Sequence, residues 1–362
     1  MSAHEILILV MACFALIGGI DRVFGSRLGL GSEFENGILA MGSLAMAMLG
    51  IIALAPVLAG VLRPVIVPIY RALGADPAMF AGTILACDMG GASLARQMTS
   101  DPQAALLGGV LCGSMMGATV VFTIPVALGI LEEQDRPCLA KGILAGIVTV
   151  PLGLLAGGLT AGFPLLMILR NLIPIVLIAG LIALGLWKAE KAMIRGFAVF
   201  GKAVVAVITF GLALAVFQEL SGIVILPGMA PLGEGFATVG AIAIVLAGAF
   251  PLVHVLVKVL QKPLLKLGKL LGINDTAAAG LIASLANSIA TFGMVKDMDS
   301  RGKILNIAFA VSAAFVFGDH MGFTAGFAPR MLPALIVGKL VGGISAVAVA
   351  LWLTKNTREE SL

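Results

Sequence analysis

Charge is scarce in this sequence. Only 12% of its 362 residues are Asp, Glu, Lys or Arg, whereas 60% are hydrophobic. Soluble globular domains carry about 25% charged residues, so this composition excludes a soluble enzyme or binding domain. Apolar runs long enough to cross a bilayer recur along the whole chain. The sequence therefore predicts an all-α polytopic membrane protein, whose first partner is the lipid bilayer.

Several chemical signatures are missing as well. The four cysteines (Cys13, Cys87, Cys112 and Cys138) have no metal-ligand spacing. Three of them lie in apolar segments, where cysteine usually acts as a small hydrophobic residue. No GxxxxGK[ST], HExxH or GxSxG motif is present, which argues against ATP-driven transport, an enzyme, a metal and a cofactor. Basic residues do not alternate with aromatic ones, so no nucleic-acid partner is expected.

One stretch organises the chain. It runs from Met79 to Met98 and reads MFAGTILACDMGGASLARQM, with Asp88 followed closely by Gly90 and Gly91. A carboxylate at the centre of a membrane helix costs about 2.5–3.5 kcal/mol on insertion scales. The stretch is too short to cross twice, so we predict a re-entrant helical hairpin over residues 77–98 with Asp88 near its turn. The alternative is a crossing helix with a buried, neutralised Asp88.

A second stretch has the same order of features. It reads AGLIASLANSIATFGMVKDM and predicts another hairpin over residues 276–295, with Asn287 and Ser288 in the position of Asp88. Two such halves indicate an internally duplicated transporter. We predict a first repeat at residues 1–163, a linking helix and basic loop at 164–202, and a second repeat at 203–362.

Charges and turn residues divide the remaining apolar runs. The linking helix is expected at residues 165–187, followed by a basic loop from Lys188 to Lys202. A second basic loop is expected from Lys258 to Lys269, after a span at 236–256. Residues 304–324 are expected to form one continuous helix.

Basic residues distinguish two topologies. With both hairpins re-entrant there are nine full transmembrane helices, and 17 Lys and Arg residues lie on one face against 4 on the other. If both hairpins cross fully, the division is far more even. The positive-inside rule favours the first topology, with the N-terminus outside and the C-terminus cytoplasmic. The two repeats then have inverted topology, which suits alternating access to a site at the midplane.

Few polar side chains lie in the apolar segments, and these are the candidate substrate-binding residues. Asp88 is interpreted as the counter-ion of a cationic substrate or coupling ion; its alternative partners are hairpin backbone N–H groups or Arg96. Asp319 and His320 are interpreted as substrate contacts or a proton relay, or else as a packing pair. Neighbouring helical residues point about 100° apart, so we expect only one of them to face a cavity squarely.

Four runs carry a resemblance to a known family. They read FENGILAMGSLAMAMLG, ALAPVLAGVLRPVIVPIYRALGADPAMFAGTILACDMGG, GSMMGATVVFTIPVALGI and KGILAGIVTVPLG. Together they closely resemble the ethanolamine permeases of bacterial ethanolamine-utilisation operons, over essentially the whole chain. The second hairpin is also similar, more weakly and in architecture only, to concentrative nucleoside transporters. The family resemblance implies uptake of ethanolamine across the bacterial inner membrane.

The polar residues suit such a substrate. The ethanolamine amine is expected to be protonated at neutral pH, like a Lys side chain with a pKa of about 10.4. Asp88 and Asp319 supply negative charge, while Asn287, Ser288 and Thr119 supply hydrogen bonds for the hydroxyl. Phe323 is expected to close the pocket. Flux is predicted to be facilitated diffusion or gradient-coupled, and the glycine-rich helix faces are compatible with a homo-oligomer.

Two other functions remain open. One is an ion-coupled transporter of another small polar substrate, such as a nucleoside. The other is a membrane enzyme or a scaffold of the ethanolamine-utilisation machinery, for which the short soluble loops offer little docking surface.

Overall fold

The computed structural model describes residues 1–355, with only the backbone described at residues 260–262, 264 and 267. The end of the predicted second repeat, residues 356–362, lies outside the described residues. Arg358 and the side chain of Lys262, both assigned to the basic face, lie outside them too. The described chain is all-helical and contains no strand, in agreement with the predicted class.

The first part of the chain forms long helices separated by short ones. They are α1 (Ala3–Val23), α2 (Leu30–Ala72), α3 (Ala78–Ile84), η1 (Cys87–Met89), α4 (Gly91–Met98), α5 (Pro102–Leu106), η2 (Leu107–Gly117), η3 (Thr119–Thr123), α6 (Ile124–Ile130), η4 (Glu133–Asp135), α7 (Arg136–Ile147) and α8 (Val150–Thr160).

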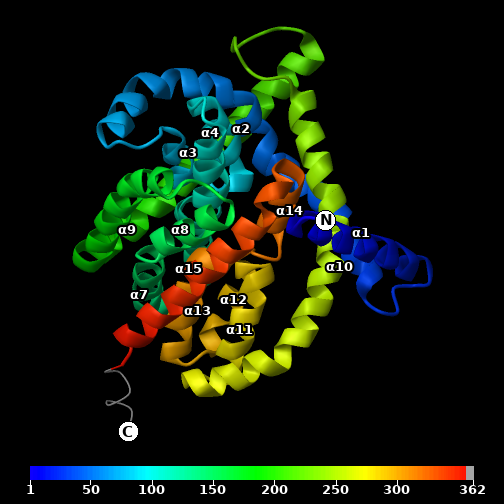
Figure 1. Ribbon diagram of the computed structural model, residues 1–362, viewed down its shortest axis with the longest axis vertical. Helices are drawn as coiled ribbons and strands as arrows, with labels where there is room; N and C mark the ends of the chain where they lie inside the picture. Colours follow the sequence, from blue (N-terminus) through cyan, green and yellow to red (C-terminus); the bar gives the residue numbers. More distant parts are fainter. Residues whose placement is uncertain (356–362) are drawn as a thin grey trace.

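The second part has the same character. Its helices are α9 (Leu165–Ser221), α10 (Leu232–Leu271), α11 (Asp275–Ala286), α12 (Ser288–Met294), η5 (Val295–Asp297), α13 (Ser300–Ala313), α14 (Asp319–Phe327), η6 (Pro329–Met331) and α15 (Leu332–Leu353). Figure 1 shows α10 running along one side of the molecule and α15 crossing its middle.

Seven helices of the described chain are long and apolar enough to cross a membrane. The predicted number was nine, and the difference has two sources. The 57 residues of α9 consist of two helices joined at a sharp kink at Ala189, so α9 is counted once but covers two predicted spans. The span expected at residues 304–324 is divided between α13 and α14 and is not continuous. Nine crossings therefore stay a prediction.

One predicted basic loop is wrong and the other is far shorter than predicted. Between Lys188 and Lys202 the chain is helical except for a sharp kink at Ala189 (φ −141°, ψ 47°), where the two helices of α9 meet. Lys258 to Lys269 lies within α10. No proline interrupts the first segment, and lysine is a good helix former. Long basic side chains can extend toward polar surroundings without ending the helix.

Short paired helices occupy both predicted hairpin positions. Helices α3 and α4 contact each other around η1, and α11 contacts α12 across Asn287. Figure 1 shows α3 and α4 in the upper part of the molecule and α11 and α12 in the lower part. Their entry into a membrane from opposite sides stays a prediction.

The helix expected at residues 304–324 is interrupted between Ala313 and Asp319. The interruption contains Phe315 with a positive φ of 63°, a conformation that costs a non-glycine residue about 1–3 kcal/mol. The backbone N–H groups of Phe315 and Phe317 donate to the carbonyls of Ser284 and Leu285 on α11 (3.0 and 2.9 Å). Hydrogen bonds to the second helical pair therefore hold the interruption open.

One buried ion pair joins the two halves of the chain. Asp135, at the start of α7, contacts Lys303 near the start of α13 with Nζ–Oδ1 at 2.5 Å. The two side chains are only 5% and 13% exposed. The pair Glu133–Arg136 lies nearby and is far more exposed. The buried pair Asp135–Lys303 thus contributes to the contact between α7 and α13. The exposed pair Glu133–Arg136 is the control for the effect of burial.

Replacing Asp135 with Asn is expected to lower the free energy of unfolding by about 3–5 kcal/mol, because Lys303 keeps a buried charge without its partner. Glu133→Gln is expected to change it by at most about 1 kcal/mol. Thermal unfolding of both variants in detergent measures the difference. Equal melting temperatures for the two variants would contradict this role of the buried pair.

Candidate functional site

The turn between α3 and α4 positions the first acidic residue. The chain leaves α3 at Leu85, passes through η1, and reverses at Gly90 with φ 89°. That left-handed conformation favours glycine. A Cβ at Gly90 would also collide with the side chain of Ile51. Both the backbone conformation and the lack of space for a Cβ therefore require glycine at position 90. The turn at Gly90 places Asp88 near α14.

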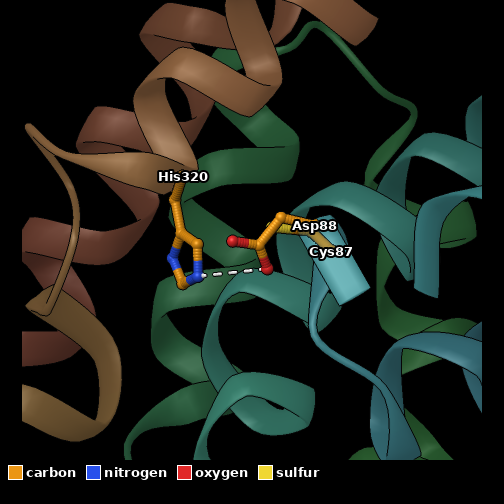
Figure 2. Close-up of side chains that lie close together, drawn as sticks. All are labelled: Cys87, Asp88 and His320. Atoms are coloured by element: carbon orange, nitrogen blue, oxygen red, sulfur yellow. Dashed lines mark ion pairs between the residues drawn. The ribbon is translucent and has the colours of Figure 1, made fainter. Parts of the chain in front are cut away.

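Asp88 faces a histidine from the other half of the chain. The Oδ1 atom of Asp88 lies 3.8 Å from Nε2 of His320, and Figure 2 shows the two side chains pointing at each other. The side chain of Asp88 is 16% exposed and that of His320 4%. Cys87 offers its thiol beside them, and the ligand atoms of all three residues lie within 4.8 Å of one another.

A cavity of about 210 Å³ opens beside this pair. Asp88, Asp319 and His320 line it together with the aromatic rings of Phe122 and Phe315. The ring of Phe315 lies 5.2 Å from His320 and 5.6 Å from Phe122, measured between centroids. The cavity therefore combines two carboxylates with aromatic faces, the two groups that attract an organic cation.

Asp319 and His320 both line this cavity. They were expected inside one continuous helix. Helix α14 instead begins at Asp319, and Gly318 before it has a non-helical conformation (φ −115°, ψ −131°). Asp319 and His320 are the first two residues of α14 and still point about 100° apart, so which of them faces the cavity more squarely stays a prediction.

Lys339 is the residue that sequence reasoning missed. It lies on α15, is 1% exposed, and donates from Nζ to the carbonyl of Ser114 at 2.5 Å. It interacts electrostatically with Cys87 and Asp88. Its position within an apolar run was the available signal, since an ionisable residue at membrane depth is a functional candidate by default.

A second cavity, of about 430 Å³, lies on another side of Asp319. Its polar lining includes Glu33, His254 and Asn287, and His254 Nδ1 lies 3.6 Å from Oε1 of Glu33. Among the described residues, Asp319 alone lines both cavities. His254 and Glu33 therefore lie together at the wall of this cavity.

Other predicted residues lie apart from these walls. Thr119 is fully buried and donates to the carbonyls of Met115 (2.7 Å) and Val311 (3.0 Å). Phe323 is 1% exposed and stacks on Phe327. Ser288 is buried, and its hydroxyl has no hydrogen-bond partner within residues 1–355. Substrate contact by Thr119, Phe323 and Ser288 stays a prediction.

Two further predicted residues have clear structural partners. Asn287 lines the second cavity and caps α12, since its Oδ1 accepts from the N–H of Ile289 at 2.8 Å. Arg96 donates to the carbonyl of Phe327 at 3.3 Å and lies 3.6 Å from the centroid of its ring. These contacts of Arg96 are with α14 and not with Asp88, so Arg96 is not the partner of Asp88, whereas the backbone alternative for Asp88 stays open.

The chain was then compared with known proteins. The model of the family described as "Ethanolamine utilisation protein, EutH" matches residues 3–353. The "Probable ethanolamine permease EutH" of Listeria monocytogenes is 58% identical, with 100% of this chain and 97% of that protein covered. The protein of the same name from Salmonella typhimurium is 48% identical, with 98% and 96% covered. No solved structure matches.

Replacing Gly90 with Ala is expected to lower uptake of the transported substrate at least about tenfold and to lower the melting temperature. Alanine disfavours the positive φ, and its Cβ displaces Ile51, which moves Asp88 away from His320. Gly129→Ala, on α6, is the control because a Cβ there meets no atom within 4 Å. Uptake assays and thermal unfolding check both variants; a Gly90→Ala protein indistinguishable from Gly129→Ala would contradict the requirement.

Proposed function

Because this chain belongs to the EutH family of ethanolamine utilisation proteins, we propose that it is a membrane transporter that carries protonated ethanolamine into the cytoplasm. The names of its relatives in Listeria monocytogenes, Salmonella typhimurium and Escherichia coli, each a "Probable ethanolamine permease", support the substrate. The apolar helices support a place in the bacterial inner membrane.

The observation that carries the proposal is the pair of carboxylates in the aromatic-walled cavity. Asp88 and Asp319 interact electrostatically, and Lys339 adds one positive charge nearby. With His320 neutral, both carboxylates ionised and the lysine protonated, the site carries a net charge of −1. A single ammonium group neutralises it. The faces of Phe122 and Phe315 add cation–π attraction of about 0.5–2 kcal/mol.

Cavity size favours a small substrate over a nucleoside. Pockets for drug-sized ligands occupy about 300–1,000 Å³, whereas the cavity beside Asp88 measures about 210 Å³. A water molecule takes about 30 Å³ of liquid, so this cavity holds an amino-alcohol with a few waters. The resemblance to nucleoside transporters therefore supports only the architecture.

Asp319 supports a path through the protein. It lines both cavities, and the interrupted segment before it is held by hydrogen bonds to α11. In the proposed path the ammonium passes from Asp88 to Asp319 in one cavity and leaves Asp319 through the other. Movement of the α11–α12 pair relative to α14 would then expose Asp319 to one side at a time, as alternating access requires.

The proposed architecture follows the sequence prediction. The two repeats, residues 1–163 and 203–362, have inverted topology, and the α3–α4 and α11–α12 pairs re-enter the membrane from opposite faces. The N-terminus lies outside and the C-terminus in the cytoplasm, as the basic residues favour. In both halves the paired short helices precede an irregular segment, η2 in the first and the α13–α14 interruption in the second.

The direct test is uptake of labelled ethanolamine into liposomes that contain only the purified protein. Uptake in this system distinguishes a transporter from a scaffold, because no other component is present. Equilibration without accumulation identifies facilitated diffusion, and accumulation driven by a proton or sodium gradient identifies coupling. Absence of uptake would contradict the proposed function.

Asp88→Asn is expected to lower ethanolamine uptake at least about tenfold at neutral pH. The variant loses the charge that binds the ammonium, and a hydrogen bond to a charged group is worth about 1.5–3 kcal/mol, or roughly a tenfold to hundredfold change. Glu219→Gln replaces an exposed carboxylate outside both cavities and is expected to transport normally. Normal uptake by the Asp88→Asn variant, at wild-type protein levels, would disprove the assignment.

Asp319→Asn is expected to slow ethanolamine entry and exit equally, because Asp319 borders both cavities. Glu33→Gln is expected to raise the apparent KM mainly from the side that the second cavity faces. Counterflow measured from each side of oriented proteoliposomes separates these effects. Normal counterflow in both directions for Asp319→Asn would exclude a shared step at this residue.

A further inference from the structure

Cys87, Asp88 and His320 bring three different metal-ligand types together. A thiol, a carboxylate and an imidazole lie within 4.8 Å of one another. Cys87 is 1% exposed and His320 3% exposed. Two of the three residues come from the η1 turn and the third from α14, so the cluster forms only when the two halves of the chain pack together (Figure 2).

We propose that this cluster is a binding site for one divalent transition-metal ion of the Zn²⁺ class. A thiolate, an imidazole and a carboxylate are the donors that Zn²⁺ and related thiophilic ions bind in proteins. Three protein ligands leave the fourth tetrahedral position open toward the cavity for a water molecule. Asp88 and His320 also belong to the proposed ethanolamine site, so metal and ethanolamine exclude each other; this one consequence rests on the proposed function.

The geometry needs only a small adjustment. Bond lengths of 2.0–2.3 Å to a tetrahedral ion place neighbouring ligand atoms about 3.5 Å apart. The contact from Asp88 Oδ1 to His320 Nε2 already measures 3.8 Å. The Cys87 thiol lies within 4.8 Å of both other ligand atoms and would have to move closer to them when a metal binds.

The outer ring nitrogen of His320 bears on how firmly the site would hold a metal. This Nδ1 atom is buried and has no hydrogen-bond partner in the part of the chain that the structure describes. A metal bound at Nε2, the atom that faces Asp88, leaves Nδ1 unpaired, so no outer hydrogen bond fixes the orientation of the ring. A permanent zinc site usually holds its histidine by an outer hydrogen bond. The site is accordingly an exchangeable one that inhibits transport reversibly.

Charge balance is compatible with a bound dication. On binding, the S–H bond of Cys87 breaks, its proton leaves to cavity water, and the sulfur electron pair forms the metal–sulfur bond. Thiolate and carboxylate together neutralise the two charges of the metal. Lys339 stays on the carbonyl of Ser114 and favours the thiolate by its charge.

The test is titration of the purified full-length protein with Cd²⁺, followed by the absorption of the cadmium–thiolate bond. Wild-type protein is expected to bind one ion per chain with this absorption, and Cys87→Ser to lose it. Cys112→Ser is the matched control, because Cys112 is equally buried and belongs to no cluster of metal-ligand side chains in the described chain. It is expected to retain the absorption.

Transport gives the second readout. Cd²⁺ is expected to inhibit ethanolamine uptake by wild-type protein, and Cys87→Ser to require at least about 100-fold more Cd²⁺ for the same inhibition. Uptake by Cys87→Ser without metal shows that the variant is folded. Should Cys87→Ser misfold, His320→Gln is titrated instead and is expected to bind Cd²⁺ at least about tenfold more weakly.

Two results would overturn the site: no cadmium–thiolate absorption in wild-type protein, or unchanged absorption in the Cys87→Ser variant. A different result would show that the proposed transport function is wrong while the metal site is right. In that case Cd²⁺ binds at Cys87 as expected, but ethanolamine neither crosses the liposome membrane nor displaces the metal.

Discussion

The need to satisfy backbone hydrogen bonds determines the form of the site. An unpaired N–H or C=O group away from water costs several kcal/mol in a membrane, so a helix can be interrupted there only if other groups replace its lost bonds. The interruption after α13 meets this condition. The N–H groups of Phe315 and Phe317 donate to carbonyls near the end of α11, which lack partners inside their own helix. The interruption after α13 and the end of α11 thus satisfy each other's backbone hydrogen bonds.

This mutual pairing explains why the polar residues gather at one place. Once the helix restarts at Asp319, the carboxylate lies at the first turn of α14, where the helix dipole favours negative charge. The strained φ of Phe315 directs its ring toward Phe122 and His320. On the opposite wall, the turn at Gly90 presents Asp88. A movement that breaks the bonds to α11 would therefore change the position of Asp319 and the shape of the cavity together.

The sequence predicted the chemistry of the site better than its geometry. Asp88, Asp319 and His320 were identified because polar side chains stand out in apolar runs, and all three line one cavity. The interruption before Asp319 was missed because residues 314–317, Ala-Phe-Val-Phe, are apolar, and the single Gly318 after them resembles the many glycines inside the spans. Contacts with α11, distant in sequence, stabilise it. The basic segments within α9 and α10 were mistaken for loops because charge was treated as a sign of a helix end.

Lys339 shows why the site retains capacity for a cation. A buried lysine that interacts with Asp88 would normally neutralise that carboxylate completely. Here its ammonium is directed to the carbonyl of Ser114, so it lowers the negative potential without occupying the space between Asp88 and Asp319. Without Lys339, two uncompensated carboxylates would repel each other across the empty cavity. With it, the residual charge matches one ammonium, and the cavity walls decide which ammonium compound fits.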